Sequence, residues 1–111
     1  MATLQSIEVT QCDNELLGLA VPSGGTFSVE LFLFKLGGGI SVAPINYTVQ
    51  NAGLLPPGNY TLLLVGINWG GPSNFKVTVN YKTGPATVLT YGQQNPGVGV
   101  VWTPAGVPFT I

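Results

Sequence analysis

The sequence predicts one all-β domain over residues 1–111, an antiparallel Greek-key β-sandwich. Three observations predict it: short apolar runs that alternate with a period of two, turn motifs of Gly, Pro and Asn between them, and no segment with a capped helical period. At 111 residues the chain has the size of one domain and can bury a core without disulfides or a metal. Its 45 % hydrophobic content excludes a disordered chain.

Two segments show the alternation most clearly. In residues 26–35 one predicted face holds Phe27, Val29, Leu31 and Leu33, and the other holds Ser28, Glu30, Phe32 and Phe34. In residues 74–82 Phe75, Val77, Val79 and Tyr81 alternate with Lys76, Thr78, Asn80 and Lys82. The second segment therefore predicts a strand with one face in water.

Seven further strands are predicted, each bounded by turn residues. They are residues 3–10, 15–21, 40–50, 59–67, 86–91, 99–103 and 108–111.

Charged residues make up only 6 % of the chain, against about a quarter in ordinary soluble domains. There is no Arg or His, and residues 36–75 carry no charge at all. Without a basic patch to neutralise phosphates, binding to nucleic acid is not expected.

Catalysis is not expected either. No His can act as a general base, no Arg can clamp a phosphate or carboxylate, and Cys12 has no imidazole to activate it. A glycosidase-like pair among Glu8, Asp13, Glu15 and Glu30 was weighed against the ordinary role of such acids in solubility, and the ordinary role is favoured. We expect no enzyme, no catalytic residue and no cofactor.

A metal site is also not expected. One thiol and no His exclude the usual zinc and copper ligand sets. Asp13, Asn14 and Glu15 offer oxygen ligands of the kind calcium prefers, but without EF-hand spacing a turn between two strands is favoured. Because Cys12 is alone, it forms no disulfide within the chain.

The segment LPPGNY, residues 55–60, has the L-x-P-G-x-Y spacing of a tyrosine corner. In this motif the chain resembles the immunoglobulin-like and fibronectin-type β-sandwiches. The resemblance implies that the Tyr60 hydroxyl reaches back to a backbone group and holds a Greek-key crossing in place. About four predicted strands follow Gly58, so the strand order stays open between an immunoglobulin-like and a jelly-roll-like arrangement.

Strand 59–67 is apolar on both faces, as is the end of strand 26–35. An apolar outer face needs a cover. We expect either a second subunit, with Phe32, Phe34, Leu63 and Val65 as contacts, or a long loop of the same chain.

Trp69 lies in a glycine-rich turn that gives a large ring little local cover. A flat apolar ring among amides and hydroxyls suits neutral sugars. If the two loops meet, the candidate set is Asn68, Trp69, Asn74, Gln93, Gln94 and Asn95. The alternative is that Trp69 folds back as a lid, and Trp102 is expected in the core.

The favoured function is a non-catalytic, lectin-like module for neutral carbohydrate. The alternative is a structural or assembly protein that binds a protein partner or its own copies. A weaker one is a membrane-active module that inserts Trp69, Phe32 and Phe34, although no basic residues flank them.

No signal sequence or membrane-spanning run is recognised, so we expect a cytoplasmic location, a signal-less export route, or a sequence that begins after a removed signal. The sequons at Asn46 and Asn59 are therefore taken as coincidental.

Overall fold

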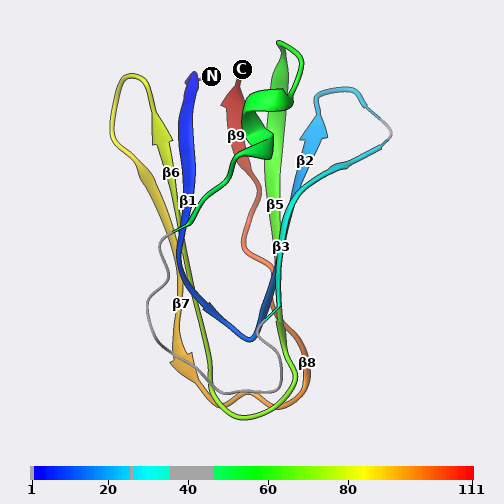
Figure 1. Cartoon of the computed structure of the whole chain (residues 1–111), viewed down its shortest axis with the longest axis vertical. Coiled ribbons are helices and arrows are strands. Elements are labelled where there is room, and N and C mark those ends of the chain that lie inside the picture. Colours follow the sequence, from blue (N-terminus) through cyan, green and yellow to red (C-terminus); the bar gives the residue numbers. More distant parts are fainter. Residues whose placement is uncertain (1, 26, 36–46) are drawn as a thin grey trace.

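The computed structural model describes residues 2–25, 27–35 and 47–111, with every side chain in these ranges except that of Gln93. Two antiparallel sheets pack face to face (Figure 1), which confirms the predicted all-β sandwich. The strand order in the first sheet is β4-β1-β6-β7, and in the second it is β3-β2-β5-β8, with β9 also paired to β5. Along the chain the strands cross repeatedly from one sheet to the other, so that β1 lies beside β6 and β2 beside β5.

Each predicted strand segment contains an observed strand. The four-stranded sheet is formed by β1 (Leu4–Asp13), β4 (Tyr47–Thr48), β6 (Ser73–Tyr81) and β7 (Thr87–Gln94). The five-stranded sheet is formed by β2 (Glu15–Pro22), β3 (Val29–Lys35), β5 (Asn59–Asn68), β8 (Gly99–Trp102) and β9 (Val107–Thr110). A short 3-10 turn, η1 (Asn51–Leu54), joins β4 to β5. Most of the predicted strand 40–50 lies outside the described residues, as does Asn46.

The core lies between the sheets and follows the period of two. On β6 the inward side chains of Phe75, Val77 and Val79 are fully buried, while Lys76 is exposed. This confirms the predicted two faces of segment 74–82. Side chains alternate across a strand, so one buried face per strand is enough to build the core.

The predicted faces of segment 26–35 are wrong beyond Leu31. Gly18 pairs with Phe32 and Leu19 with Glu30, so β3 carries one extra residue, a β-bulge at Leu31. The bulge switches the alternation: Leu31 and Phe32 are both buried, at 1 % and 5 % exposure, and Leu33 turns outward. Gly18 makes this possible, because a Cβ there would overlap the Phe32 ring.

The tyrosine corner forms as its spacing predicts. The Tyr60 hydroxyl donates a hydrogen bond of 2.6 Å to the Pro56 carbonyl. The Tyr60 ring stacks on Phe109 of β9, with centroids 5.5 Å apart. Backbone bonds between Gly58 and Ile111 close the same end of the sandwich. The corner thus fixes β5, an inner strand of the five-stranded sheet, against β9, the last strand of the chain.

Among the described residues, no helix has the length and apolar character needed to cross a membrane.

Candidate functional site

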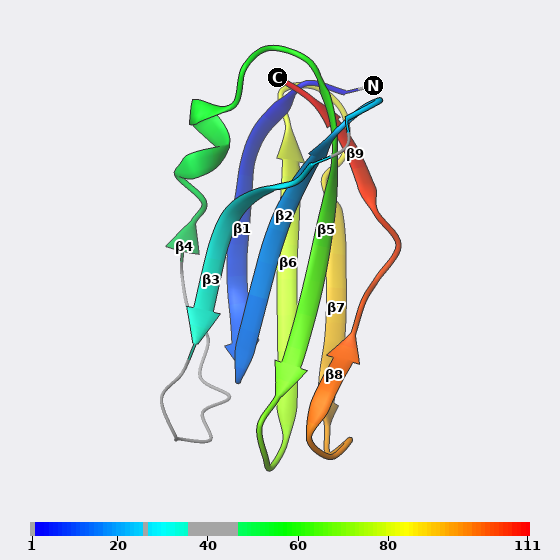
Figure 2. The same cartoon turned by 90° about the vertical axis from the view of Figure 1, so that its right-hand side faces the viewer.

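The most unusual surface of the molecule is the outer side of the five-stranded sheet, which Figure 2 views from the front. Along β5 the inward residues are buried and the alternate ones point outward. The outward series, continued one step past the strand, is Leu63, Val65, Ile67 and Trp69. None of these side chains is polar except at the indole nitrogen of Trp69.

Neighbouring strands extend this apolar series sideways. Leu17 on β2 lies directly between Leu33 on β3 and Val65 on β5. Leu19 pairs with Leu63, and Ile67 pairs with Val100 on β8. We call the resulting surface the outer face; it comprises Leu17, Leu19, Leu33, Leu63, Val65, Ile67, Trp69 and Val100.

The outer face is partly open to solvent, and its central residues Leu17, Val65 and Ile67 are half-buried. Leu33 is 53 % exposed, Val100 62 % and Trp69 58 %. Aliphatic side chains in a central sheet position are normally covered, and a contiguous exposed group of them is typical of an interaction surface.

One end of the outer face carries a neutralised charge. Glu15 is only 9 % exposed and lies 3.9 Å from the Lys35 ammonium. The Trp69 indole N–H also donates to the Glu15 carboxylate, at 3.3 Å. The Glu15 carboxylate is therefore partnered twice, whereas Glu30, which pairs with Leu19 at the other end of this surface, is exposed and would need a partner if the face were covered.

Trp69 is both anchored and exposed. Its backbone N–H donates to the Asn14 side-chain oxygen at 2.7 Å, and its indole is held by Glu15. Trp69 is not buried: it is 58 % exposed, and its indole N–H reaches the Glu15 carboxylate at the start of β2. Its partners lie 54 and 55 residues away in the sequence, so no local pattern indicates them.

Asn68 was predicted as a ligand-binding residue, but the structure buries it completely. Its amide donates to the carbonyls of Gly71 (2.9 Å) and Gly97 (2.8 Å), and its oxygen accepts from the Gly70 N–H. The two loops do meet, but the residue that joins them has no capacity left for a ligand.

The other predicted sugar contacts are scattered. Asn74 is half-buried and pairs with Asp13 across β1 and β6. Gln94 and Asn95 are exposed, and the Gln93 side chain lies outside the described part. Trp69 thus remains the one aromatic member of the set, and the exposed amides of Gln94 and Asn95 lie at the end of β7 and just after it.

The predicted subunit contacts divide into two pairs. Leu63 and Val65 belong to the outer face. Phe32 and Phe34 do not, because the β3 bulge turns them inward; their ring centroids are 5.8 Å apart, and Phe34 meets Tyr47 edge-on at 4.6 Å. The same burial removes Phe32 as a membrane-inserting side chain.

Trp102 is half-buried and stacks on Phe75 across the sandwich, with centroids 5.6 Å apart and planes within 5°. A Cβ on Gly66 would lie 2.8 Å from Phe75 and 3.0 Å from Trp102, so this stack needs a glycine. The expectation that Trp102 packs on the core is consistent with this geometry.

The chain between β1 and β2 buries a polar corner. Asp13 and Asn14 are 0 % and 4 % exposed, and the Asn14 amide donates to Asp13. Asp13 Oδ2 has no hydrogen-bond partner in the described structure. Nearby, burial raises the pKa of the Cys12 thiol to about 12, and the charges of Asp13 and Glu15 add to the shift. Such a thiol is inert as a nucleophile near neutral pH.

Within the described ranges, no three His, Cys, Asp or Glu side chains gather in a way that could hold a metal ion.

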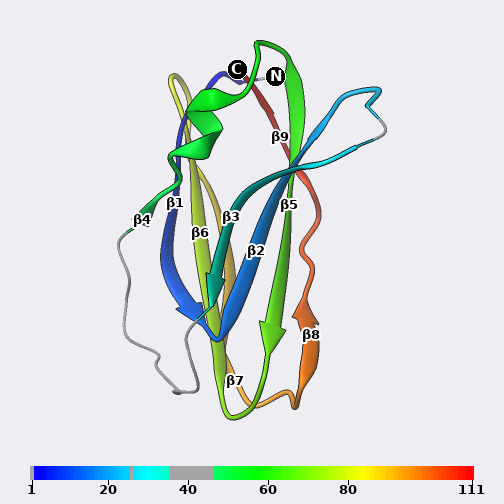
Figure 3. The same ribbon diagram turned by 45° about the vertical axis from the view of Figure 1, so that its right-hand side comes forward.

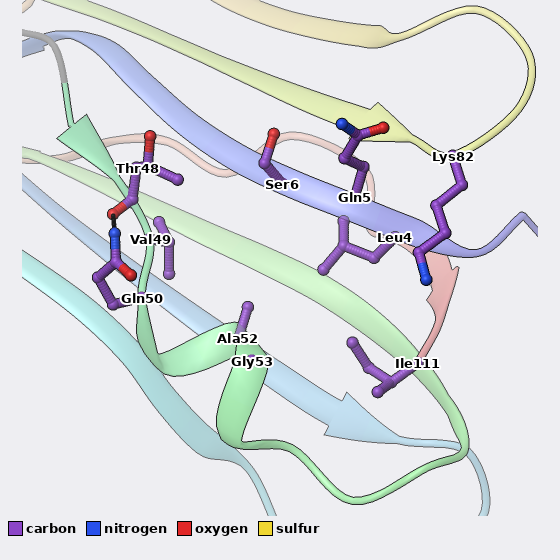
Figure 4. Close-up of a pocket in the computed structure, with 10 residues that line it drawn as sticks. All are labelled: Leu4, Gln5, Ser6, Thr48, Val49, Gln50, Ala52, Gly53, Lys82 and Ile111. Atoms are coloured by element: carbon purple, nitrogen blue, oxygen red, sulfur yellow. Dashed lines mark hydrogen bonds between the residues drawn. The ribbon is translucent and has the colours of Figure 1, made fainter.

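An open groove of about 380 Å³ lies between β1 and η1 (Figure 4). Its lining is mostly uncharged, with Lys82 at one end, and it contains no carboxylate. The groove offers no acid–base pair for catalysis, and the sequence patterns did not indicate it.

The fold and these surfaces define an antiparallel β-sandwich with a largely apolar outer face on its five-stranded sheet. No protein-family model matches the chain, and comparison with curated proteins and with solved structures gives no match either.

Proposed function

We propose that the protein is a non-catalytic assembly subunit that associates with further copies of itself through the outer face. One observation carries the proposal: the outer face is a contiguous apolar surface across paired strands of the described sheet, and Leu33, Leu63 and Val100 in it are exposed.

Sheets pack on one another through interdigitating apolar side chains about 10 Å apart. The outer face has the composition of such an inner layer. Leu17, Leu33 and Val65 form one row across three strands, and Ile67 and Val100 lie in the next row beside Glu15. Two copies related by a two-fold axis would each cover the other's row.

A second copy is a better occupant than a charged partner. The chain has a net charge of only −1, so two copies repel each other weakly. The Glu15 and Lys35 side chains already pair with one another, which leaves Glu30, at the rim beside Leu19, for a charged partner to meet.

The experiment is to measure the mass in solution, by sedimentation equilibrium, of the wild type and of a Leu63→Lys variant. Leu63 belongs to the outer face and is 37 % exposed, so the fold should tolerate the change. We expect the wild type to be larger than its 11.5 kDa monomer and the variant to be smaller than the wild type. A matched control is Thr78→Lys, which adds the same charge to the outer side of the other sheet and should leave the mass unchanged.

A wild type that stays at the monomer mass up to the highest soluble concentration would overturn the proposal.

Recognition of neutral carbohydrate is the second candidate, and the geometry of Trp69 favours it. Trp69 is held by the bond from its backbone N–H to Asn14 and by the bond from its indole N–H to Glu15, so its exposed ring is a rigid stacking surface. Gln94, at the end of β7, and Asn95, just after it, are also exposed.

A glycan array with wild type and Trp69→Ala separates the two candidates. Binding to one sugar class that Trp69→Ala loses, at unchanged mass, supports the carbohydrate function. A well-folded wild type that binds no glycan removes it.

A further inference from the structure

A sheet edge exposes unpaired backbone N–H and C=O groups, and proteins normally protect it. Three of the four described edges here are protected. β3 carries Glu30, Lys35 and the bulge at Leu31. β4 is only two residues long. β8 and β9 are four residues each, with a break between them and Pro108 in the second.

The fourth edge, β7, is less protected: its register shift lies near its C-terminal end, between Tyr91 and Gln94. It is eight residues long, TVLTYGQQ, with no charged residue and no proline. It pairs with β6 in constant register from Thr87 to Tyr91, and within the described chain it has no strand on its other side. Figures 2 and 3 show β7 at the outer margin of its sheet.

The side chains of β7 are also incompletely covered. Leu89 and Tyr91 are half-buried, whereas their partners Val77 and Phe75 on β6 are fully buried. On the outer side, Val88 is 53 % exposed. A further strand beside β7 would pair its free backbone groups and cover the flanks of Leu89 and Tyr91.

We propose that this strand is β7 of a second copy, antiparallel about a two-fold axis near Leu89, so that two four-stranded sheets become one continuous sheet. In this register inward residues meet inward residues. Val88 of each copy lies opposite Thr90 of the other, a pairing of two β-branched side chains.

Charge favours the second copy as occupant. β7 has no charge of its own. The nearest cation is Lys76 on β6, which pairs with Thr90 of β7. The two Lys76 side chains would be separated by three strand spacings, about 14 Å. This exceeds the screening length of about 8 Å at physiological salt, so they would not oppose the contact.

The inference rests on the proposed function, self-assembly, and extends it. The β7 edge and the outer face belong to different sheets, so one copy can use both at once. Two separate two-fold contacts on each subunit allow growth beyond a dimer.

The test compares the masses of five proteins by sedimentation: wild type, the face variant Leu63→Lys, the edge variant Val88→Lys/Thr90→Lys, the face and edge changes combined, and the control Thr78→Lys. Thr78 is on β6 and pairs with Val88 of β7. The control therefore adds the charge in the same row but one strand inside the edge. Circular dichroism checks that each protein is folded.

We expect the wild type to exceed a dimer, the face and edge variants to be dimers, the combination to be a monomer, and the control to match the wild type.

The outcomes separate the two contacts. If the edge variant keeps the wild-type mass, or the face variant alone is monomeric, the edge inference is overturned. If the face variant keeps the wild-type mass while the edge variant is monomeric, the face proposal fails and the edge inference is supported.

Disulfide trapping checks the register. Residues directly opposite in an antiparallel pair are close enough for a disulfide. A mixture of Val88→Cys and Thr90→Cys proteins should form the mixed disulfide dimer several-fold faster under mild oxidation than either protein alone. The native Cys12 is 1 % exposed and will not compete. Equal rates for the mixture and the single variants would overturn the register.

Discussion

The hydroxyl of Tyr60 donates a 2.6 Å hydrogen bond to the carbonyl of Pro56, four residues earlier in the chain. This bond ties the turn before β5 to the strand it precedes, while the Tyr60 ring holds Phe109. Because β5 also carries Leu63, Val65 and Ile67 of the outer face, the corner determines how that surface is presented.

Replacing Tyr60 by Phe removes this bond and leaves the ring stack. We expect the free energy of unfolding to fall by about 1 kcal/mol, the usual contribution of one hydrogen bond with a buried partner. Urea unfolding measures it. Tyr81→Phe is the matched control, because the Tyr81 hydroxyl makes a longer bond of 3.3 Å, to Pro108, at an exposed site. An equal loss in both variants would show that the corner bond has no special role.

Gly18→Ala should destabilise the fold by about 1–3 kcal/mol, because the added methyl group overlaps the buried Phe32 ring. Gly53→Ala is the control, since nothing lies within 4 Å of a Cβ at that position. Thermal unfolding should show a lower Tm for Gly18→Ala alone. If Gly18→Ala is as stable as the wild type, the packing of Phe32 against β2 is not as described.

Asn68→Ala should lower the free energy of unfolding by about 2 kcal/mol, since it removes two donated bonds and leaves the Gly71 and Gly97 carbonyls without that partner. Asn95→Ala, at an exposed position, should have no effect on stability. Denaturant titration compares the two. A fully stable Asn68→Ala would contradict a structural role and return Asn68 to the ligand-binding candidates.

Cys12 should make stability depend on alkaline pH. Its pKa is about 12 in the folded protein, against 9.0 for an ordinary thiol, so the folded state retains the proton where the unfolded state loses it. The contribution is present below pH 9 and is lost as the pH rises toward 12, at up to about 1.4 kcal/mol per pH unit.

The measurement for Cys12 is urea unfolding at several pH values from 8 upward, with Cys12→Ala as the reference that has no thiol. The wild type should lose stability faster than Cys12→Ala above pH 9. Parallel pH profiles would show that the thiol ionises normally in the folded protein.

Much of the fold could be predicted because it depends on local signals. Alternation and turn residues located a strand in every predicted segment, and the L-x-P-G-x-Y spacing located the Tyr60 bond. The bulge at Leu31 could not be predicted, because it depends on which residue of β2 lies opposite. Only the pairing of Gly18 with Phe32 shows that an aromatic ring can turn inward there.

The site was predicted less well, for a related reason. Trp69 was treated as part of a loop, whereas counting by twos from Leu63 places it on the outward series of β5. That signal was present in the sequence. The contact between Trp69 and Glu15 could not be predicted, because it joins residues 54 positions apart. Asn68 resembles a ligand-binding amide in the sequence, and only the structure shows its bonds to Gly71, Gly97 and Gly70.

The composition of the outer face has a thermal consequence. An association driven by burying Leu, Ile, Val and Trp side chains has a large negative heat-capacity change and weakens on cooling. Sodium chloride should have little effect on it, since the Glu15–Lys35 pair is the only charge pair involved in the described face, while sulfate should strengthen it. An assembly held in this way would come apart in the cold and re-form on warming.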